Sequence, residues 1–348
     1  MINNIIKLSI IIPHYNGIKI LTECLDSLHN CSYKNLEILV VDNGSTDNSI
    51  EIAKEKFSDV NFIYSSKNRG YAGGCNYGAK FTKGEYFLFL NNDTIHEFNW
   101  IEPLVEKLEK NQNISSVQPK ILNYDNRDKF DYAGGSGGEL DFLVYPFSKG
   151  RIFDSIEFDC GQYDKSTEIF WASGTGFITR KSIFNLIGGF DEVLFAHMEE
   201  IDYHWRSHLM GFSVYVEPKS VIYHMGGRTL AYNSPEKTYL NHRNSLLLML
   251  TNFSIPLSIF LIFPRLLLEF TSIFRYILMG RLKHSFAQLR AILWILFNLH
   301  VLVIRRFKSW QLRTISDKQV LKKMYSKSIV WQYFVRNLKT YSNLEVKR

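Results

Sequence analysis

At 348 residues the chain is long enough for one large α/β domain and an appended region. Its four cysteines form no Cys-x-x-Cys pair and follow no regular spacing, which argues against a disulfide framework and a zinc site and favours a reducing compartment. Of the 41 Lys/Arg and 34 Asp/Glu side chains, residues 265–348 hold 17 and 3. A basic tail on an acidic body indicates an anionic partner, either lipid head groups or nucleic acid.

The first 64 residues alternate between apolar runs and amphipathic segments. We predict strands at residues 8–12, 36–42 and 61–64, because each is a short apolar run bounded by turn residues. Helices are predicted between them, at residues 16–29 and in the segment that ends at Phe57. This order predicts a parallel sheet with right-handed crossovers. The apolar N-terminus contains no cleavage site, so we interpret it as the first strand and not as a signal peptide.

Two predicted strands end in polar residues that could bind a ligand. Asp42 closes the second strand, and Asn91, Asn92 and Asp93 follow a further apolar strand at residues 86–90. Ligands of open α/β sheets bind beyond the carboxyl ends of such strands. A lone carboxylate beside neutral acceptors suits a divalent cation, Mg²⁺ or Mn²⁺, that takes its other ligands from water and a substrate's phosphates. The alternative is an Asx-rich turn that caps the next helix.

A glycine-rich segment, residues 68–78, lies between these two strand ends. Gly70 and its neighbouring glycines would let the backbone approach a ligand, and Arg69 could bind a phosphate. No Gly-Lys-Ser/Thr follows, so it is not a Walker loop, and the absence of GxGxxG leaves little support for dinucleotide binding. We predict a glycine-rich turn, with tight packing as the alternative reason for the glycines.

The pattern is less regular beyond residue 96. We predict a helix at 97–110 and a strand near 116–121. Loops with short strands are predicted over 124–167. This segment is either a surface excursion or part of a substrate pocket. A strand at 177–179 follows a run of small residues. Trp171, just before that run, could stack on a ligand or belong to the core.

Residues 197–209 are predicted to form an acidic helix. Its core face repeats at four-residue spacing, at Ile201, Trp205 and Leu209. A second stripe holds Glu199, Asp202 and Arg206. This stripe is either a solvated face with a weak Asp202–Arg206 pair or, with Glu200, a catalytic cluster of three acids.

The C-terminal part contains two charge-free runs, residues 244–264 and 291–304. Arginines flank both: Arg243, Arg265, Arg290, Arg305 and Arg306. We expect helices that lie in a membrane interface with basic flanks on anionic lipid. The alternatives are a helical subdomain, an oligomer contact, or a single membrane crossing by residues 244–264.

The motifs PHYNG, VDNGSTDNS, NRGYAGGCNYG, LFLNNDT, WASGTGFITR and GGFDEVLFAHMEEIDYHWR occur in this order. Together they resemble the family-2 inverting glycosyltransferases, and within them the rhamnosyltransferase-like branch of bacterial surface-polysaccharide assembly. The resemblance covers residues 8 to 245. It implies the α/β GT-A fold with a mixed, mainly parallel central sheet. Residues 1–95 would form the nucleotide-binding half, 96–245 the acceptor-binding half, and 246–348 a basic, helical, membrane-associated region.

The resemblance also implies roles for individual residues. Asp42 would accept the imide N–H of a uracil or thymine base. Asn92 and Asp93 match a metal-binding Asp-x-Asp site in which Asn91 replaces the first acid, a change that should weaken metal binding. Glu200 would be the general base. Glu199 and Asp202 would orient the acceptor or tune Glu200.

His224 would lie near the metal or diphosphate, although a lone histidine after an apolar run is usually a half-buried structural residue. Arg228 would stabilise the leaving diphosphate. The predicted donor contacts are Pro13, Tyr15, Asn16, Asp42, Asn68, Arg69, Gly70, Asn76, Asn92, Asp93, Gly174 and Arg228. The predicted metal ligands are Asp93 and His224.

The resulting hypothesis is a metal-assisted inverting glycosyltransferase at the cytoplasmic face of the plasma membrane, acting alone or as a homo-oligomer. It would move a sugar, best guessed as L-rhamnose, from a dTDP- or UDP-linked donor to a hydroxyl of a glycan or lipid-linked saccharide. Alternatives within the family are UDP-hexose or UDP-galactofuranose transfer. An inactive scaffold is another alternative, given Asn91 and Glu200.

Two alternatives lie outside the family. A nucleic-acid-binding protein is disfavoured because the basic tail contains lipid-like apolar runs and the body is acidic. A nucleotidyltransferase would need a glycine-rich loop with Arg and Lys after the first strand, and PHYNG contains neither.

Overall fold

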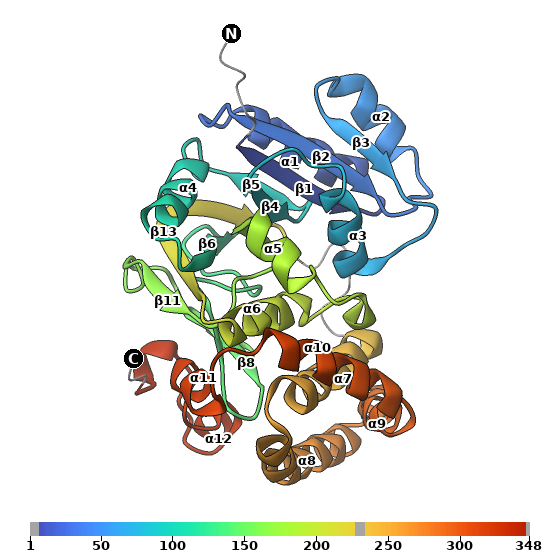
Figure 1. The fold of residues 1–348 in the computed structure, drawn as a ribbon, viewed down its shortest axis with the longest axis vertical. Coiled ribbons are helices and arrows are strands. Elements are labelled where there is room, and N and C mark those ends of the chain that lie inside the picture. The colour runs from blue at the N-terminus through green and yellow to red at the C-terminus, as the bar shows by residue number, and fades with distance from the viewer. Residues whose placement is uncertain (1–6, 227–233, 346–348) are drawn as a thin grey trace.

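A computed structural model describes residues 7–226 and 234–345. Its central sheet has the order β11-β13-β6-β12-β4-β1-β2-β3, with β5 paired to β13 (Figure 1). Strands β3, β2, β1 and β4 are parallel, whereas β12 runs antiparallel to both β4 and β6. The expected mixed α/β sheet is therefore confirmed. Its strands are β1 (Leu8–His14), β2 (Leu36–Asp42), β3 (Asn61–Tyr64), β4 (Tyr86–Leu90), β5 (Thr94–His96), β6 (Ile114–Asn123), β11 (Thr167–Ile169), β12 (Gly176–Arg180) and β13 (Ser213–His224).

Helices cover both faces of this sheet, and this explains the continuous apolar runs of its strands. On β1, Ile10 and Ile12 pack in one core cluster with α1 and α4, whereas Ile11 packs in another with α3, α5 and α6. Alternate residues of one strand thus enter different layers. These helices are α1 (Ile18–His29), α2 (Ser49–Lys56), α3 (Gly70–Ala79), α4 (Ile101–Lys110), α5 (Lys181–Ile187) and α6 (Glu199–Leu209).

The glycine-rich segment is a helix, α3, so the predicted turn is wrong. Packing explains its composition, because α3 lies very close to the sheet. A Cβ added at Gly78 would lie 2.6 Å from a methyl group of Val41 and 2.7 Å from one of Ile11. The glycines that looked like a ligand cradle thus allow a helix and a sheet to approach each other.

The irregular segment forms a second, four-stranded sheet of the order β10-β9-β8-β7. Its strands are β7 (Gly138–Leu140), β8 (Pro146–Ser148), β9 (Arg151–Ile152) and β10 (Ser155–Ile156). Phe147 and Ile152 pack there against Tyr325, Ile329 and Tyr333 of the chain's last part. The C-terminal tail therefore packs on this segment, which is not a surface excursion.

The C-terminal region is helical, as expected, and its helices cluster together below α6 in Figure 1. They are α7 (Pro235–Asn252), α8 (Ile255–Leu278), α9 (Leu282–Phe297), α10 (Leu299–Leu312), α11 (Asp317–Lys323) and α12 (Ile329–Phe334). Helix α7 continues across the boundary predicted at residue 245. A break after Asn252 divides the charge-free run, so the suggested crossing by residues 244–264 is wrong.

By length and composition alone, one described helix, α8, could cross a membrane. Helices α9 and α10 pass the same test only as a pair, and they are bent by 73° relative to each other.

Candidate active site

The sheet brings Asp42 and the Asn91-Asn92-Asp93 run to one edge. In the parallel register Asp42 lies opposite His14 at the end of β1, and β1 lies between β2 and β4. Neighbouring strands are about 4.8 Å apart, so the two strand ends are separated laterally by about 10 Å. Asp42 is half-buried, and its Oδ1 accepts the N–H of Ser45 at 2.8 Å. The carboxylate is thereby fixed at the edge where ligands of α/β sheets bind.

Two of the predicted donor contacts, Tyr15 and Asn16, lie in the loop after β1. Asn16 has a left-handed backbone (φ 56°), and its side chain binds the loop after β2: Oδ1 accepts the N–H of Thr46 at 2.8 Å, and Nδ2 lies 3.2 Å from the Thr46 hydroxyl. Asn16 therefore joins two loops of the edge. Tyr15 beside it is 40% exposed, and its ring is open to a ligand. Pro13 packs close to Gly74 of α3.

Asn92 is buried and fixed by a relay of hydrogen bonds. Its Nδ2 donates to His14 Nδ1 at 2.8 Å, and His14 Nε2 lies 3.0 Å from the hydroxyl of Ser49. Burial lowers the pKa of His14 to about 4, so its imidazole is neutral and can accept from the amide. Asn92 thus orients the turn that carries Asp93.

His224 lies between two buried carboxylates. Its Nε2 is 3.1 Å from Asp93 Oδ1, and its Nδ1 is 2.8 Å from Asp131 Oδ1. Burial by itself would lower the pKa of His224, but the two carboxylates outweigh it and raise the pKa to about 10. The structure thus places His224 beside Asp93, and it adds Asp131, which the sequence analysis missed. Nothing in the irregular segment distinguishes Asp131 from the other aspartates around it.

This donor set fits a divalent cation that arrives with a substrate, provided that the cation displaces the proton on His224 Nε2, because a metal-binding imidazole nitrogen must be unprotonated. A carboxylate on the far nitrogen of an imidazole is the usual arrangement that orients a metal-binding histidine, and Asp131 holds that position. Across residues 7–226 and 234–345, no group of three or more His, Cys, Asp or Glu could hold an ion alone. Asp93 and His224 would therefore need water and phosphate oxygens as further ligands.

Glu199 and Glu200 lie in the first turn of α6. Burial raises the pKa of Glu200 to about 7, although the backbone N–H groups of Gly174 and Ile201 near its carboxylate oppose the rise. Burial, followed by the charge of Glu200, raises the pKa of Glu199 well above its usual value. The Oε2 atom of each accepts no hydrogen bond from any residue the structure describes. An acid in this state can accept a proton near neutral pH.

Contacts along the chain connect Glu200 to the sheet edge. The backbone N–H of Asn91 donates to Thr175 O at 2.9 Å, so the segment that contains Gly174 lies beside the end of β4. The hydroxyl of Tyr71 on α3 donates to Gly174 O at 2.5 Å. The predicted residues Gly174 and Glu200 therefore lie together near the Asn91-Asn92-Asp93 run. Tyr71 joins them and was missed, because its glycine-rich surroundings suggested a turn.

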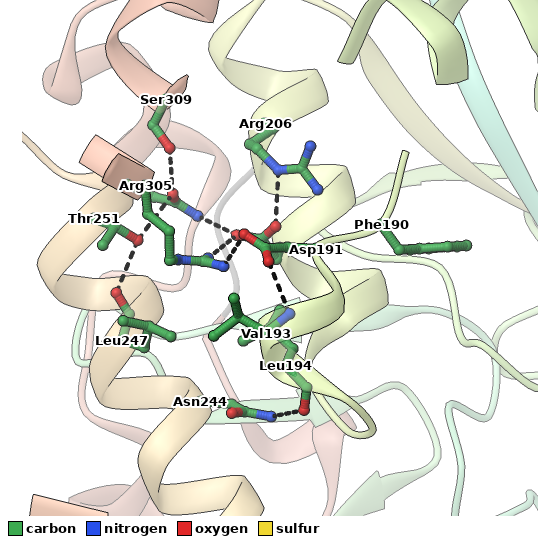
Figure 2. Close-up of polar contacts among 12 residues, drawn as sticks. Phe190, Asp191, Val193, Leu194, Arg206, Asn244, Leu247, Thr251, Arg305 and Ser309 are labelled. Atoms are coloured by element: carbon green, nitrogen blue, oxygen red, sulfur yellow. Dashed lines mark hydrogen bonds and ion pairs between the residues drawn. The ribbon is translucent and has the colours of Figure 1, made fainter. Parts of the chain in front are cut away.

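The segment before α6 is strained. Phe195, His197 and Met198 have φ angles of 62°, 65° and 73°, in the left-handed region that side chains other than glycine rarely adopt. Asn244 of α7 holds this segment, since its Nδ2 lies 2.6–3.1 Å from the carbonyl oxygens of Leu194, Ala196 and His197. Figure 2 shows the bond to Leu194. A residue of the C-terminal region thus fixes the entry to the acidic helix.

Asp202 is fully buried in an ion network, which contradicts a solvated face. Its Oδ2 accepts from Arg206 Nε at 2.8 Å, and its Oδ1 accepts from Arg305 of α10 at 2.8 Å and from Asn252 at 3.1 Å. Figure 2 labels the two arginines. Burial opposes ionisation, but Arg206 and Arg305 outweigh it and hold the pKa of Asp202 below its usual value. Asp202 therefore anchors α6, and the predicted role of orienting an acceptor does not fit.

Arg305 also pairs with Asp191, whose Oδ1 accepts the N–H of Val193 at 3.0 Å (Figure 2). One guanidinium of the C-terminal region thereby holds both the anchor of α6 and the turn before it.

Three further predictions for the donor site need correction. Asn76 uses both ends of its amide on the backbone of Phe190, at 2.8 and 2.9 Å, so it fixes that turn and has no free end for a donor. The Arg69 guanidinium lies over the ring of Tyr77, 4.9 Å from its centre, and its Nε donates to Ser65, so this side chain is partly held by the protein itself. Gly70 packs against Phe195 and not against open space.

Among the other predicted residues, Asn68 is exposed, and its side chain accepts the N–H of Gly70 at 2.8 Å. Trp171 belongs to the core: it is buried, and its Nε1 donates to Glu139 O at 2.8 Å. Arg228 lies outside the described residues.

Comparisons with known proteins identify relatives of the chain by sequence. The chain is 30% identical over 216 residues to the uncharacterized glycosyltransferase RT0329 of Rickettsia typhi, covering 62% of each chain. It is 34% identical over 124 residues to the glycosyltransferase GlyG of Streptococcus pneumoniae, covering 35% of this chain and 41% of that one. The chain therefore matches less than two thirds of the length of these relatives.

Solved structures share the fold at low sequence identity. GalNAc-T7, in a crystal structure with UDP, GalNAc and Mn²⁺, has a TM-score of 0.57 at 16% identity and covers 73% of this chain and 49% of its own. TarS of S. aureus has a TM-score of 0.51 at 19% identity, with 75% and 43% covered. The model of glycosyl transferase family 2 matches residues 9–186, just over half of the chain. The protein therefore belongs to glycosyl transferase family 2.

Proposed function

We propose that the protein transfers a sugar from a nucleoside diphosphate donor to a hydroxyl acceptor with inversion, and that Glu200 is the general base. The carrying observation is the state of Glu200: a half-buried acid with a pKa of about 7, one oxygen without a partner among the described residues, and a position next to the ligand-binding edge of the sheet. Family membership supports the reaction class.

The chemistry needs one proton transfer and no covalent enzyme intermediate. The acceptor oxygen attacks the anomeric carbon from the side opposite the diphosphate. As the new C–O bond forms, the bond to the diphosphate oxygen breaks and the leaving group keeps the electron pair. Glu200 takes the proton of the acceptor hydroxyl and becomes neutral, which its low-polarity surroundings favour. A divalent cation held by Asp93 and His224 would offset charge on the diphosphate.

The donor is proposed to carry uracil or thymine, since a carboxylate at Asp42 suits the imide N–H of these bases and disfavours cytosine. The structure of GalNAc-T7 contains UDP, but at 16% identity that likeness concerns the fold, so the proposal depends on Asp42. We further propose L-rhamnose from dTDP-rhamnose as the sugar and a glycan or lipid-linked saccharide as the acceptor. Both follow from the resemblance of the sequence motifs to the rhamnosyltransferase-like branch.

A panel of nucleotide sugars tests this proposal. The melting temperature of the full chain would be measured with UDP-, dTDP-, CDP- and GDP-linked sugars, with and without Mg²⁺ or Mn²⁺. A bound donor raises the melting temperature by mass action, so UDP or dTDP sugars should stabilise the protein and CDP and GDP sugars should not. Stabilisation by CDP sugars alone, or by no nucleotide at any cation concentration, would contradict the proposal.

A further inference from the structure

Helix α8 directs its charged residues inward and its apolar residues outward. Arg265 and Glu269 in the middle of the helix are 1% and 0% exposed. The opposite face consists of large apolar side chains that are 55–73% exposed: Ile255, Ile259, Phe260, Phe263, Leu267, Phe270, Phe274 and Leu278. A helix on a water-facing surface has the reverse arrangement, with polar residues outside. The outward face of α8 therefore lacks the polar side chains that are typical of a helix face in contact with water.

The inward charges hold α8 lengthwise against the rest of the protein. Arg265 donates to Glu269 at 2.8 Å, to the backbone oxygens of Leu143 and Val144, and to Ser245 of α7. Glu269 also accepts from His242 of α7 at 2.7 Å. These contacts attach the middle of α8 to the α/β domain and to α7. A helix attached in this way offers one long face to a partner.

Exposed apolar side chains also occur on α9, which packs against α8, and on α10, which packs against α9 and α7. The large side chains there are 41–79% exposed: Leu282, Phe286, Leu293, Leu296, Phe297, Leu299, Val303, Ile304, Phe307 and Trp310. Together with the outward residues of α8, we call this surface the apolar face. Exposed contiguous apolar patches of this kind mark interaction sites in soluble proteins.

Charge selects among the partners that could cover the apolar face. From residue 255 to residue 312 the chain contains one acid, Glu269, and it is fully buried. Arg275, Arg281, Lys283 and Lys308 are exposed over the same range. A second copy of the chain would bring like charges together, whereas anionic lipid head groups would meet opposite charges.

We propose that the apolar face inserts into one leaflet of a bilayer that contains anionic lipid, with the exposed basic residues on the head groups. The protein would then be monotopic: α8, a helix of 24 residues, lies along the surface over about 36 Å. Binding depends on no nucleotide or acceptor, so its test is separate from that of the transfer reaction.

Vesicle flotation of the full chain tests the insertion. Wild-type protein should float with vesicles of phosphatidylcholine and phosphatidylglycerol, and less with phosphatidylcholine alone. Replacing Phe260, Phe263, Leu267 and Phe270 by Ser should lower the partition constant at least about 100-fold, because four large apolar side chains no longer enter the leaflet. The matched control replaces four exposed apolar residues of the α/β domain by Ser: Ile52, Phe98, Phe158 and Leu186. It should float like the wild type.

A second measurement needs no destabilising variant. Trp310 is 70% exposed on the apolar face, so vesicles with brominated lipid should quench its fluorescence, and Trp310→Phe should lose that part of the quenching. Wild-type protein that does not float, or a quadruple variant that floats like the wild type, would overturn the proposal. Light scattering measures the oligomeric state of both proteins. If the wild type is a dimer, the quadruple variant is a monomer and flotation is unchanged, a second copy of the chain covers the apolar face and the proposal is overturned.

Discussion

Helix α6 contains two groups of acids that are electrostatically opposite, although every one of these acids is at least half-buried. Glu199 and Glu200 in the first turn have raised pKa values and a carboxylate oxygen without a partner among the described residues. Asp202, less than one turn later, has a lowered pKa and binds two arginines and an asparagine. The difference comes from the partners that the rest of the chain supplies. Burial with partners produces an anchor, and burial without them produces a group that can take up a proton.

The strongest test of the first group is Glu200→Gln. The amide keeps the shape of the side chain but cannot accept the acceptor's proton, so kcat should fall about 10²–10⁴-fold. Donor affinity, measured by calorimetry, should stay within about twofold, because Glu200 is proposed to act on the acceptor. Turnover of the variant at the wild-type rate would show that another residue is the base.

The strongest test of the second group is Asp202→Ala. Removing this carboxylate leaves Arg206 and Arg305 buried with less compensation, which should lower the free energy of unfolding by about 3–5 kcal/mol in urea denaturation. The matched control is Glu106→Ala, which breaks another pair spaced i, i+4, with Lys110, on the exposed surface of α4. The control should change stability little. Equal effects of the two variants would contradict the anchoring role.

The two groups also predict opposite responses of stability to pH. The pKa of Glu200 rises from 4.5 to about 7 on folding, so between these values the folded state binds more protons, and stability decreases as pH rises. Relative to the wild type, Glu200→Gln should therefore gain about 1–3 kcal/mol at pH 8 compared with pH 5. Asp202 has the opposite sign: its contribution is present near neutral pH and is lost as the pH falls through its lowered pKa. Urea denaturation at several pH values measures both, and a Glu200→Gln effect independent of pH would contradict the raised pKa.

The smallest expected effect concerns the strained entry to α6. Asn244→Ala removes the amide that holds Leu194, Ala196 and His197, and it should cost about 1–2 kcal/mol of stability. It should also lower kcat about tenfold, because the turn with Glu200 is less well positioned. Thr251→Val on the same helix serves as control: it removes a bond to Leu247 within α7 and a longer one, at 3.4 Å, to the neighbouring Asn252. An unchanged kcat in Asn244→Ala would show that the strained segment does not position the base.

Much of the α/β fold was predictable, because strands buried on both faces read as apolar runs. The predictions for β1, β2, β3 and β4 are confirmed within two residues. Helix α3 was not predictable in the same way, since glycine is a poor helix former and only the closeness of the sheet explains its use. Strand order predicted that Asp42 and Asp93 lie at one edge of the sheet, and the family resemblance predicted that Glu200 belongs to the same site.

The partners of those acids were not predictable. Arg305 reaches Asp202 across 103 residues, Asp131 reaches His224 across 93, and Asn244 lies far along the chain from the turn that it holds. No periodicity or local motif connects positions at such distances. For the same reason the anchoring role of Asp202 could not be predicted, whereas the prediction of Glu200 as the base depended on the family resemblance.

The ion pair between Arg305 and Asp202 has a consequence for the order of events during synthesis. Helix α6 leaves the ribosome long before Arg305, and at about 5–20 residues per second the missing 103 residues take roughly 5–20 s to make. During that interval Asp202 lacks one of its two arginines, so α6 is incompletely anchored. The nascent chain therefore completes its acidic helix only when its last large helices have been translated, and shortened chains that end before α10 never reach that stage.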